Sequence, residues 1–394
     1  MTDRSRTSAR QKKAIFIANI ALDYNREILL GAMSWANEHP DIRLYFSDND
    51  PPSEFLRILR TGYDGVILGA CDPALELPSK LARLGLPAVD TSGEIFPPPL
   101  PRVITHDEKV GKMAAEYFIS RGFNRFAFIG FESFHWSKQR EKGFDAVLAA
   151  HGLKAEKHHF LNLSGLSRIA EAERFCTALS RHTDSPIALF CGNDGIAAIM
   201  VETCLQAKLR VPEQIAILGV DDDHLYTRIR RPNISSVQLR PQQIGHKGMA
   251  LLGTMLQTGS RLAAEVCMVP PGEIITRHSS DVIAVNDELI REAIAYIRNH
   301  LAEGVNVKAL VYGLSVSRTK LEKRFAELLL RSPAEEIRRQ RLEIAKHLLA
   351  STTMRIGEVA SKSGFKSRQL FGEFFLRFAG TTPKKFREGA RQDG

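Results

Sequence analysis

Short apolar runs alternate with amphipathic stretches along the first 280 or so residues of the chain. The runs AIFIANI, IRLYFS, GVILGA, RFAFIGF, PIALFC and AILGV have the length and composition of buried strands. The stretches between them carry apolar residues three and four positions apart, as from about Arg26 to Asn37, which predicts helices. Strands that alternate with helices predict an α/β fold with parallel sheets covered by helices on both faces.

The last hundred residues have a different pattern, in which one short phrase occurs twice. SRTKLEKRF begins at Ser317 and SRQLFGEFF begins at Ser367, an offset of 50 residues. In each copy a serine suited to cap a helix precedes two apolar residues four positions apart, which would face inward. A further short apolar segment precedes each phrase, and such a pair of helices is typical of a helix-turn-helix unit, whose second helix can enter a major groove.

The distribution of charge favours DNA as the partner of this repeated segment. The chain has a formal net charge of +9, and from Asn286 onward it holds 21 basic and 13 acidic residues, a net of +8. Lys and Arg side chains neutralise phosphates and supply the part of DNA affinity that does not depend on sequence. A basic excess confined to two helix-turn-helix units therefore indicates double-stranded DNA.

These patterns divide the 394 residues into four parts. We expect a disordered basic N-terminus over residues 1–11 and an α/β domain over 12–280. A polar linker over 281–289 would join it to an all-α domain with two helix-turn-helix units over 290–394.

Most of the expected strands end in polar or aromatic residues. The carboxyl ends of parallel strands are where open α/β sheets bind ligands, so we expect these side chains to line one cleft. Their donors, acceptors and flat faces suit a polyhydroxylated small molecule, although single Asp and Asn residues there can equally cap the following helix. The candidate ligand-binding residues are Tyr24, Asp90, Trp136, Arg140, Asn193 and Asp221.

The repeated segment resembles the AraC-type DNA-binding domain. In the second unit Ala360, Gly364, Phe365, Phe371, Phe375, Gly380, Pro383, Phe386 and Arg387 fall where that family places them. The first unit departs from the pattern, with Val311 at a usual Ala and Ser315 and Leu330 at usual Gly positions. Positive φ is easier for Gly than for other residues, so we expect the first helix to fit less closely into the groove.

The AraC resemblance implies two recognition helices that meet successive segments of the major groove. The base-reading candidates are Arg318, Thr319, Glu322 and Lys323 in the first helix and Arg368, Gln369 and Glu373 in the second. Arg and Gln can read guanine and adenine edges, and Glu373 is expected to accept from cytosine or to orient Arg368.

The first 280 residues resemble the effector domain of LacI/GalR-type repressors, through phrases such as VPEQIAILGVDDD and IITRHSS. That resemblance implies a two-lobed ligand-binding domain over 12–280 with the fold of periplasmic sugar-binding proteins. It also implies a sugar site lined by Arg140, Asn193 and Asp221, with Trp136 one turn before Arg140 as a stacking face. A LacI-type sensor followed by an AraC-type domain implies a transcription regulator with a small sugar effector, xylose or a related pentose. We expect a homodimer, with RNA polymerase as a candidate further partner.

Two other classes of protein are less consistent with the sequence. An exported binding protein would need a signal peptide, but the early apolar stretch contains Asn19 and continues into Asp23 without a small-residue cleavage pattern. The five scattered cysteines indicate reduced thiols, so we expect a cytoplasmic protein without a membrane segment. A sugar-metabolising enzyme of the kinase type remains an alternative, as does a sugar-binding protein with no regulatory role. No phosphate-binding loop or catalytic motif supports them, and we expect no catalytic residue, cofactor or metal.

Overall fold

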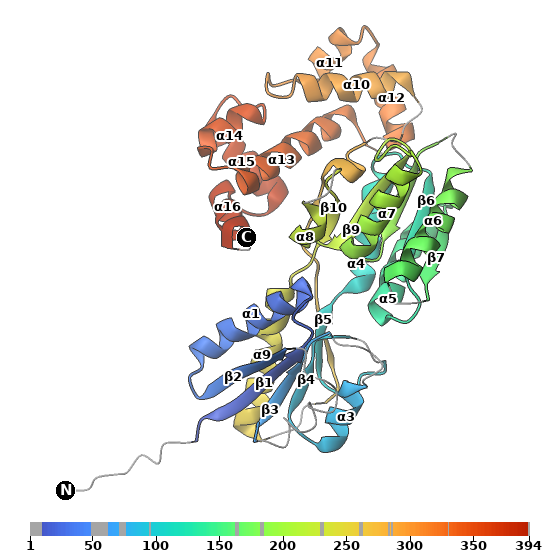
Figure 1. Cartoon of the computed structure of the whole chain (residues 1–394). Helices are drawn as coiled ribbons and strands as arrows, with labels where there is room; N and C mark the ends of the chain where they lie inside the picture. The colour runs from blue at the N-terminus through green and yellow to red at the C-terminus, as the bar shows by residue number, and fades with distance from the viewer. Residues whose placement is uncertain are drawn as a thin grey trace, which may run out of the picture. The chain divides into compact units, whose positions relative to one another are not determined.

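In a computed structural model, the chain forms two compact units (Figure 1). It describes residues 10–48, 62–70, 76–93, 96–161, 165–181, 185–228, 232–259, 263–282, 284, 287–329 and 331–392. The first unit comprises Met1–Tyr117 and Asn124–Val282, and the second comprises Phe118–Phe123 and Ile283–Gly394. Most of the expected N-terminal arm and three residues of the expected linker (283, 285 and 286) lie outside the described residues.

The first unit contains two six-stranded sheets, which confirms the predicted α/β fold. The strand order of the first sheet is β11-β5-β4-β3-β1-β2, and all of its pairs are parallel. Its strands are β1 (Lys12–Ala18), β2 (Ile42–Asp48), β3 (Gly65–Leu68), β4 (Ala88–Asp90), β5 (Arg102–Thr105) and β11 (Val266–Val269). Helices α1 (Asp23–Glu38), α3 (Leu77–Leu84) and α9 (Pro241–Thr258) belong to the same lobe.

Strand β1 shows why this lobe needs a helix layer on each face. Phe16 packs with α1 and α9, whereas Ile15 and Ile17 pack with Leu77 and Leu81 of α3. Successive side chains of a strand point to opposite faces, so a run that is apolar at every position is buried only when both faces are covered.

The second sheet repeats this plan with the order β12-β10-β9-β8-β6-β7, and only its β10–β12 pair is antiparallel among the described pairs. Its strands are β6 (Arg125–Phe131), β7 (Ala155–Phe160), β8 (Ile187–Cys191), β9 (Ile215–Asp221), β10 (Ser235–Gln238) and β12 (Ile274–Ile275). The accompanying helices are α4 (Asp107–Ile119), α5 (His135–Ala150), α6 (Gly165–Ser180), α7 (Asp194–Gln206), α8 (His224–Thr227) and the short η2 (His278–Ser280).

The second unit is helical and contains both repeated phrases. Its helices are α10 (Glu288–Asn299), α11 (Val307–Gly313), α12 (Arg318–Leu329), α13 (Pro333–Ser351), α14 (Ile356–Lys362), α15 (Arg368–Ala379) and α16 (Pro383–Gln392). Leu321 and Phe325 of α12 are buried in one core, and Phe371 and Phe375 of α15 are buried in the other. Helix α13 contributes to both cores, so it connects the two helix-turn-helix units.

The two units differ in their turns. Helices α11 and α14 begin 49 residues apart, whereas α12 and α15 begin 50 apart, so the first turn is one residue shorter. Ser315 in the first turn adopts φ = 52°, and Gly364 in the second adopts φ = 80°. The first unit therefore keeps a left-handed turn residue where it lacks Gly, at a conformational cost of about 1 kcal/mol. The expectation that the first helix fits less closely into the groove stays a prediction.

A buried carboxylate organises the start of α13. Glu336 is fully buried, and its two oxygens accept hydrogen bonds from Arg331 at 2.6 Å, Arg339 at 2.8 Å and Gln340 at 2.7 Å. Arg331 also donates to the Ser120 carbonyl, and Arg121 lies 3.6 Å from Glu343. Burial raises the pKa of Glu336, but the two arginines outweigh burial and hold it at about 2.

We therefore expect Glu336→Gln to destabilise the helical unit by about 1–3 kcal/mol, because half-buried Arg331 and Arg339 would lose their charge-assisted hydrogen bonds to a fully buried carboxylate, although Arg339 would keep Glu343 at 2.9 Å. The folded pKa lies below the unfolded value of 4.5, so the stabilisation is present above that pH and is lost as the pH falls toward 2. Hydrogen exchange of α13 peptides in the full chain, measured from pH 5 to pH 2.5, tests this expectation. The exposed Glu327→Gln serves as the control, and equal protection of α13 in both variants would contradict the prediction.

Candidate functional site

Arg140 lies at the centre of the polar residues that gather at the strand ends of the second sheet. Its side chain is 5% exposed. Its Nε donates to Asp107 at 2.8 Å and its Nη1 donates to the Gly192 carbonyl at 2.6 Å, while Asp221 lies 3.7 Å away. A buried guanidinium needs such partners, and this set fixes the direction in which it points.

Close packing of α4 against α5 holds Asp107 and Arg140 together. A Cβ atom on Gly111 would lie 1.9 Å from the Arg140 carbonyl oxygen, and one on Gly143 would lie 1.9 Å from the Glu108 carbonyl oxygen. Only glycine permits backbones to approach this closely. The two glycines therefore set the distance between the helices that carry the ion pair.

Three consecutive aspartates begin at the last residue of β9, and each has a different role. Asp221 faces Arg140, Asp222 pairs with Arg277 at 2.7 Å, and Asp223 caps α8 by accepting from the amide of Leu225. Asp221 and Asp222 adopt φ values of 111° and 56°. Backbone strain of this kind is frequent at binding sites, where neighbouring contacts hold it in place.

Tyr24 reaches the same site from the first lobe. It lies near the start of α1, and the charges of Asp107, Arg140 and Asp221 all act on its hydroxyl. Burial raises the pKa of Tyr24 above its ordinary value, so the phenol stays protonated and can donate a hydrogen bond. The site therefore draws on both lobes.

Trp136 lies one helical turn before Arg140, as the sequence indicates. The guanidinium carbon of Arg140 lies 4.7 Å from the centre of its ring, and Phe134 stacks on it with ring centres 5.4 Å apart. Phe131 meets the same ring edge-on at 6.0 Å. These contacts give Trp136 a role in positioning Arg140, and its stacking on a sugar remains a prediction.

Asn193 combines a capping role with a free donor group. Its Oδ1 accepts from the amide of Ile196 at 2.9 Å, which is the capping contact that the sequence left open as an alternative. Its amide nitrogen has no bond among those the structure describes at this residue, so it can serve a ligand. The next residue, Asp194, is buried, and burial raises its pKa well above the ordinary value.

Asp90 has a structural role that the sequence did not indicate. It is fully buried, accepts from Arg102 Nε at 2.8 Å and receives two further hydrogen bonds from Ser92 at 2.8 and 2.6 Å. Both carboxylate oxygens are therefore occupied within the first lobe. We leave Asp90 out of the candidate site, because a ligand would have to displace these bonds.

Asp107 was missed by the sequence analysis. It directly follows the β5 run RVITH, so the strand-end rule applied to the other candidates would have included it. Burial raises its pKa, and Arg140 opposes that shift. Phe134, which stacks on Trp136, was missed as well. The Gly192 carbonyl was also missed, because nothing in the sequence shows which backbone oxygen accepts from Arg140.

The electrostatics of the site suit a neutral ligand rich in hydroxyl groups. Burial raises the pKa of Asp221 to about 7, although Arg140 acts in the opposite direction. Around one positive charge the site thus offers a carboxylate acceptor at Asp221, a phenol donor at Tyr24 and an amide donor at Asn193. Such groups can satisfy sugar hydroxyls without a net charge on the ligand.

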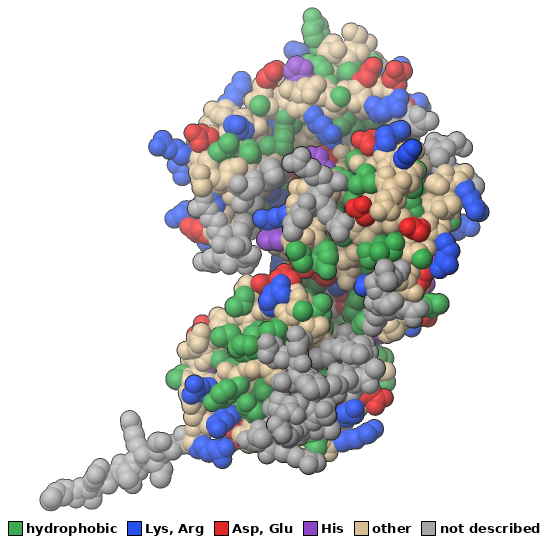
Figure 2. All heavy atoms as spheres, viewed as in Figure 1, with side chains coloured by type: hydrophobic (Ala, Val, Ile, Leu, Met, Phe, Trp, Pro, Cys, Tyr) green, Lys and Arg blue, Asp and Glu red, His purple; other side chains and the backbone are tan. Residues whose placement is uncertain are grey.

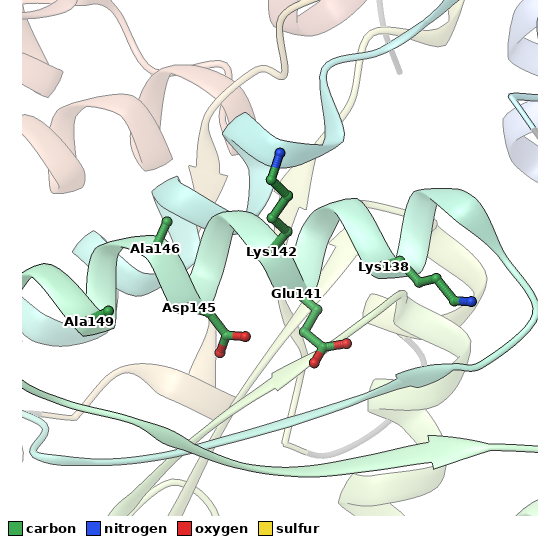
Figure 3. Close-up of a pocket in the computed structure, with 6 residues that line it drawn as sticks. All are labelled: Lys138, Glu141, Lys142, Asp145, Ala146 and Ala149. Carbon is green, nitrogen blue, oxygen red and sulfur yellow. The ribbon is translucent and has the colours of Figure 1, made fainter. Parts of the chain in front are cut away.

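A surface pocket lies elsewhere on the same lobe, along the outer face of α5 (Figure 3). Its charged lining is paired with neighbours, since Glu141 and Asp145 contact Lys157 at 2.8 and 2.5 Å and Lys142 contacts Glu108 at 3.0 Å. We interpret it as a solvated helix face.

The seven base-reading candidates stand on the outer faces of α12 and α15. All but Glu322 are exposed, and Glu322 is half-buried. Figure 2 shows Lys and Arg side chains on the visible face of the helical unit. In α12, Arg318 pairs with Glu322 at 2.8 Å and Lys323 lies 3.8 Å from Glu327.

The hydrogen bond described for Glu373 is not with Arg368, although orientation of Arg368 was one of the two roles expected of this residue. Its carboxylate accepts from Gln369 at 3.1 Å and not from Arg368 among the bonds described on α15. Orientation of an Arg by a Glu occurs instead in the first helix, between Arg318 and Glu322.

Across the described part of the chain, no group of His, Cys, Asp and Glu side chains has the arrangement of a metal site. Within the same residues, the helices are too short or too polar to cross a bilayer.

Comparison with known proteins connects both units to gene regulators. Residues 115–280 match the periplasmic binding protein-like domain family, and residues 310–389 match a helix-turn-helix domain family. The chain is 28% identical to the xylose operon regulatory protein of Escherichia coli K12, over 95% of this chain and 96% of that protein. It is 26% identical to the protein of the same name from Haemophilus influenzae, over 82% and 84%. A solved structure described as the xylose-binding transcription activator xylR has a TM-score of 0.62 at 25% identity, and covers 96% of this chain and 99% of its own.

A substitution at the contact between α4 and α5 tests whether their close packing contributes to stability. We expect Gly143→Ala to lower the stability of the first unit by about 1–3 kcal/mol, because its Cβ would overlap the Glu108 carbonyl at 1.9 Å. Gly195→Ala in α7 is the matched control, since its Cβ would meet nothing closer than 3.5 Å. Thermal unfolding of the two variants measures the difference. An equal midpoint for both would show that the helices can separate without cost.

Proposed function

We propose that this chain binds a small sugar beside Arg140 and that the bound sugar changes the affinity of the chain for operator DNA. The chain is a transcription regulator in which a periplasmic binding protein-like domain precedes an AraC-type helix-turn-helix domain. The observation that carries the proposal is the buried Arg140, held between Asp107, the Gly192 carbonyl and Asp221 at the strand ends.

Xylose or a related pentose is the proposed effector. The relatives in Escherichia coli and Haemophilus influenzae are named for the xylose operon, and the solved relative is described as xylose-binding. The donors and acceptors around Arg140 support a hydroxyl-rich ligand of this kind. A thermal-shift panel of pentoses and hexoses tests the identity, because a ligand that binds the native state raises its apparent stability.

The sugar would act by favouring one arrangement of the sensor over another. A ligand shifts such an equilibrium only by its difference in affinity for the two arrangements. Tyr24 and Arg140 come from different lobes, so a sugar that contacts both would favour the arrangement in which they approach each other. We further propose that the protein acts as a homodimer in the cytoplasm, with RNA polymerase as a candidate partner on DNA.

We expect Asp221→Asn to weaken sugar binding by tenfold or more, because a hydroxyl donates a stronger hydrogen bond to an ionised carboxylate than to an amide. The pKa of Asp221 is about 7, so binding to its ionised form should tighten as the pH rises from 6 to 8, with release of a proton. Calorimetry with xylose across this range measures both effects, and the variant should lose the pH dependence. Asp145→Asn on the outer face of α5 is the control. Unchanged affinity in Asp221→Asn would remove this residue from the site.

The two recognition helices should contribute differently to DNA binding. We expect Arg368→Ala to cost about 1–3 kcal/mol at one base pair and to relax the preference there, because Arg can read a guanine edge. Lys323→Ala should weaken binding to all sequences alike and reduce the salt slope by about one unit, as the loss of a phosphate contact would. Fluorescence anisotropy with single-base operator variants at several salt concentrations separates the two effects. A change of base preference in Lys323→Ala alone would reverse these assignments.

A further inference from the structure

The capping serines show which residues of the two recognition helices occupy equivalent positions. Ser317 Oγ accepts from the amide of Lys320 at 3.3 Å, and Ser367 Oγ accepts from the amide of Leu370 at 3.2 Å. The next residue is fully buried in both helices, as Leu321 and Phe371 respectively. Lys320 and Leu370 therefore occupy the same position in the first turn, one with a charged side chain and one with an apolar side chain.

Leu370 is exposed although it is apolar. Its side chain is 56% exposed, and the neighbouring Arg368 and Gln369 are exposed too. The apolar stripe that holds α15 in its core runs through Phe371 and Phe375, so Leu370 is not needed there. An exposed leucine among polar groups at the start of a recognition helix has the position of a group that contacts DNA bases.

The surroundings of Leu370 favour DNA over a protein partner. Lys366 and Arg368 precede it in the sequence and are exposed and positively charged, and the exposed Glu373 follows it. Gly372, two positions later, has no atom within 4 Å of where its Cβ would lie, whereas the first helix has Glu322 at the equivalent position. At this one position the second helix therefore presents less bulk and less negative charge to the phosphates than the first.

We infer that Leu370 reads the 5-methyl group of a thymine in the major groove, an inference that rests on the proposed function of the helical unit. Thymine presents this methyl at the groove edge and cytosine does not, so an apolar side chain distinguishes the two pairs. Contact between the methyl and the leucine removes apolar surface of both from water. Lys320 at the equivalent place in α12 has no such preference and is suited to a phosphate.

The test compares thymine with uracil, which differ at this position only by the methyl group. A binding site is first selected with the full-length protein from a library of random duplex DNA. Each thymine of that site is then replaced, one at a time, by deoxyuridine, and the affinity is measured by fluorescence anisotropy. Loss of one contacted methyl should lower the affinity of the wild-type protein about fourfold at one or two positions.

Variants assign that effect to Leu370. Leu370→Ala should bind the thymine and uracil sites equally at those positions, and Leu370→Met should retain most of the difference because its side chain is apolar and of similar volume. Lys320→Ala is the matched control, and it should keep the full thymine-to-uracil ratio while its salt dependence falls. Leu370 is exposed, so thermal unfolding should be the same for all of these proteins.

Two results would overturn the inference. One is a wild-type protein that is insensitive to every deoxyuridine replacement, and the other is a Leu370→Ala protein that keeps the wild-type ratio at each sensitive position. Failure of the wild-type protein to select any DNA site would instead contradict the proposed function, so the two failures are distinguishable.

Discussion

The buried positive charge of Arg140 is the constraint around which the candidate site is arranged. A guanidinium removed from water is costly unless its N–H groups are matched by acceptors. The chain supplies Asp107 from the start of α4, the Gly192 carbonyl from the end of β8 and Asp221 from the end of β9. Three separate segments are thus fixed relative to one side chain, and any ligand that contacts Arg140 acts on all of them.

The backbone around this charge is adapted to hold it. Gly111 and Gly143 allow α4 and α5 to pack at a distance that a methyl group would prevent, and this packing keeps Asp107 within 2.8 Å of Arg140. Asp221 adopts a positive φ at the end of β9, and the next residue, Asp222, pairs with Arg277 at 2.7 Å. Burial and strain at these positions are compensated by the ion pairs that they make possible.

The helical unit solves a different problem, which is to present two similar helices from one chain. Helix α13 contributes to both apolar cores, and its buried Glu336 neutralises Arg331 and Arg339 at the helix start. The two recognition helices share their cap geometry and their buried stripe but differ on their outer faces. Helix α12 has Lys320 and Glu322 at the positions where α15 has Leu370 and Gly372. A duplicated scaffold can therefore carry two distinct DNA contacts, because the residues that hold the fold and those that face outward are separate.

The sequence by itself determined the α/β class, the presence of two helix-turn-helix units and several residues of the candidate site. Periodicity, caps and strand ends are local properties, so Arg140, Asn193, Asp221 and Tyr24 could be proposed as ligand-binding residues without knowledge of the fold, and that role stays a prediction. Only the tertiary structure decided which charges pair. Asp90 and Asp107 both follow strands, yet Asp90 meets Arg102 within its own lobe and Asp107 meets Arg140. The partner of a buried charge depends on which distant segments pack beside it, and the sequence around a residue does not contain that information.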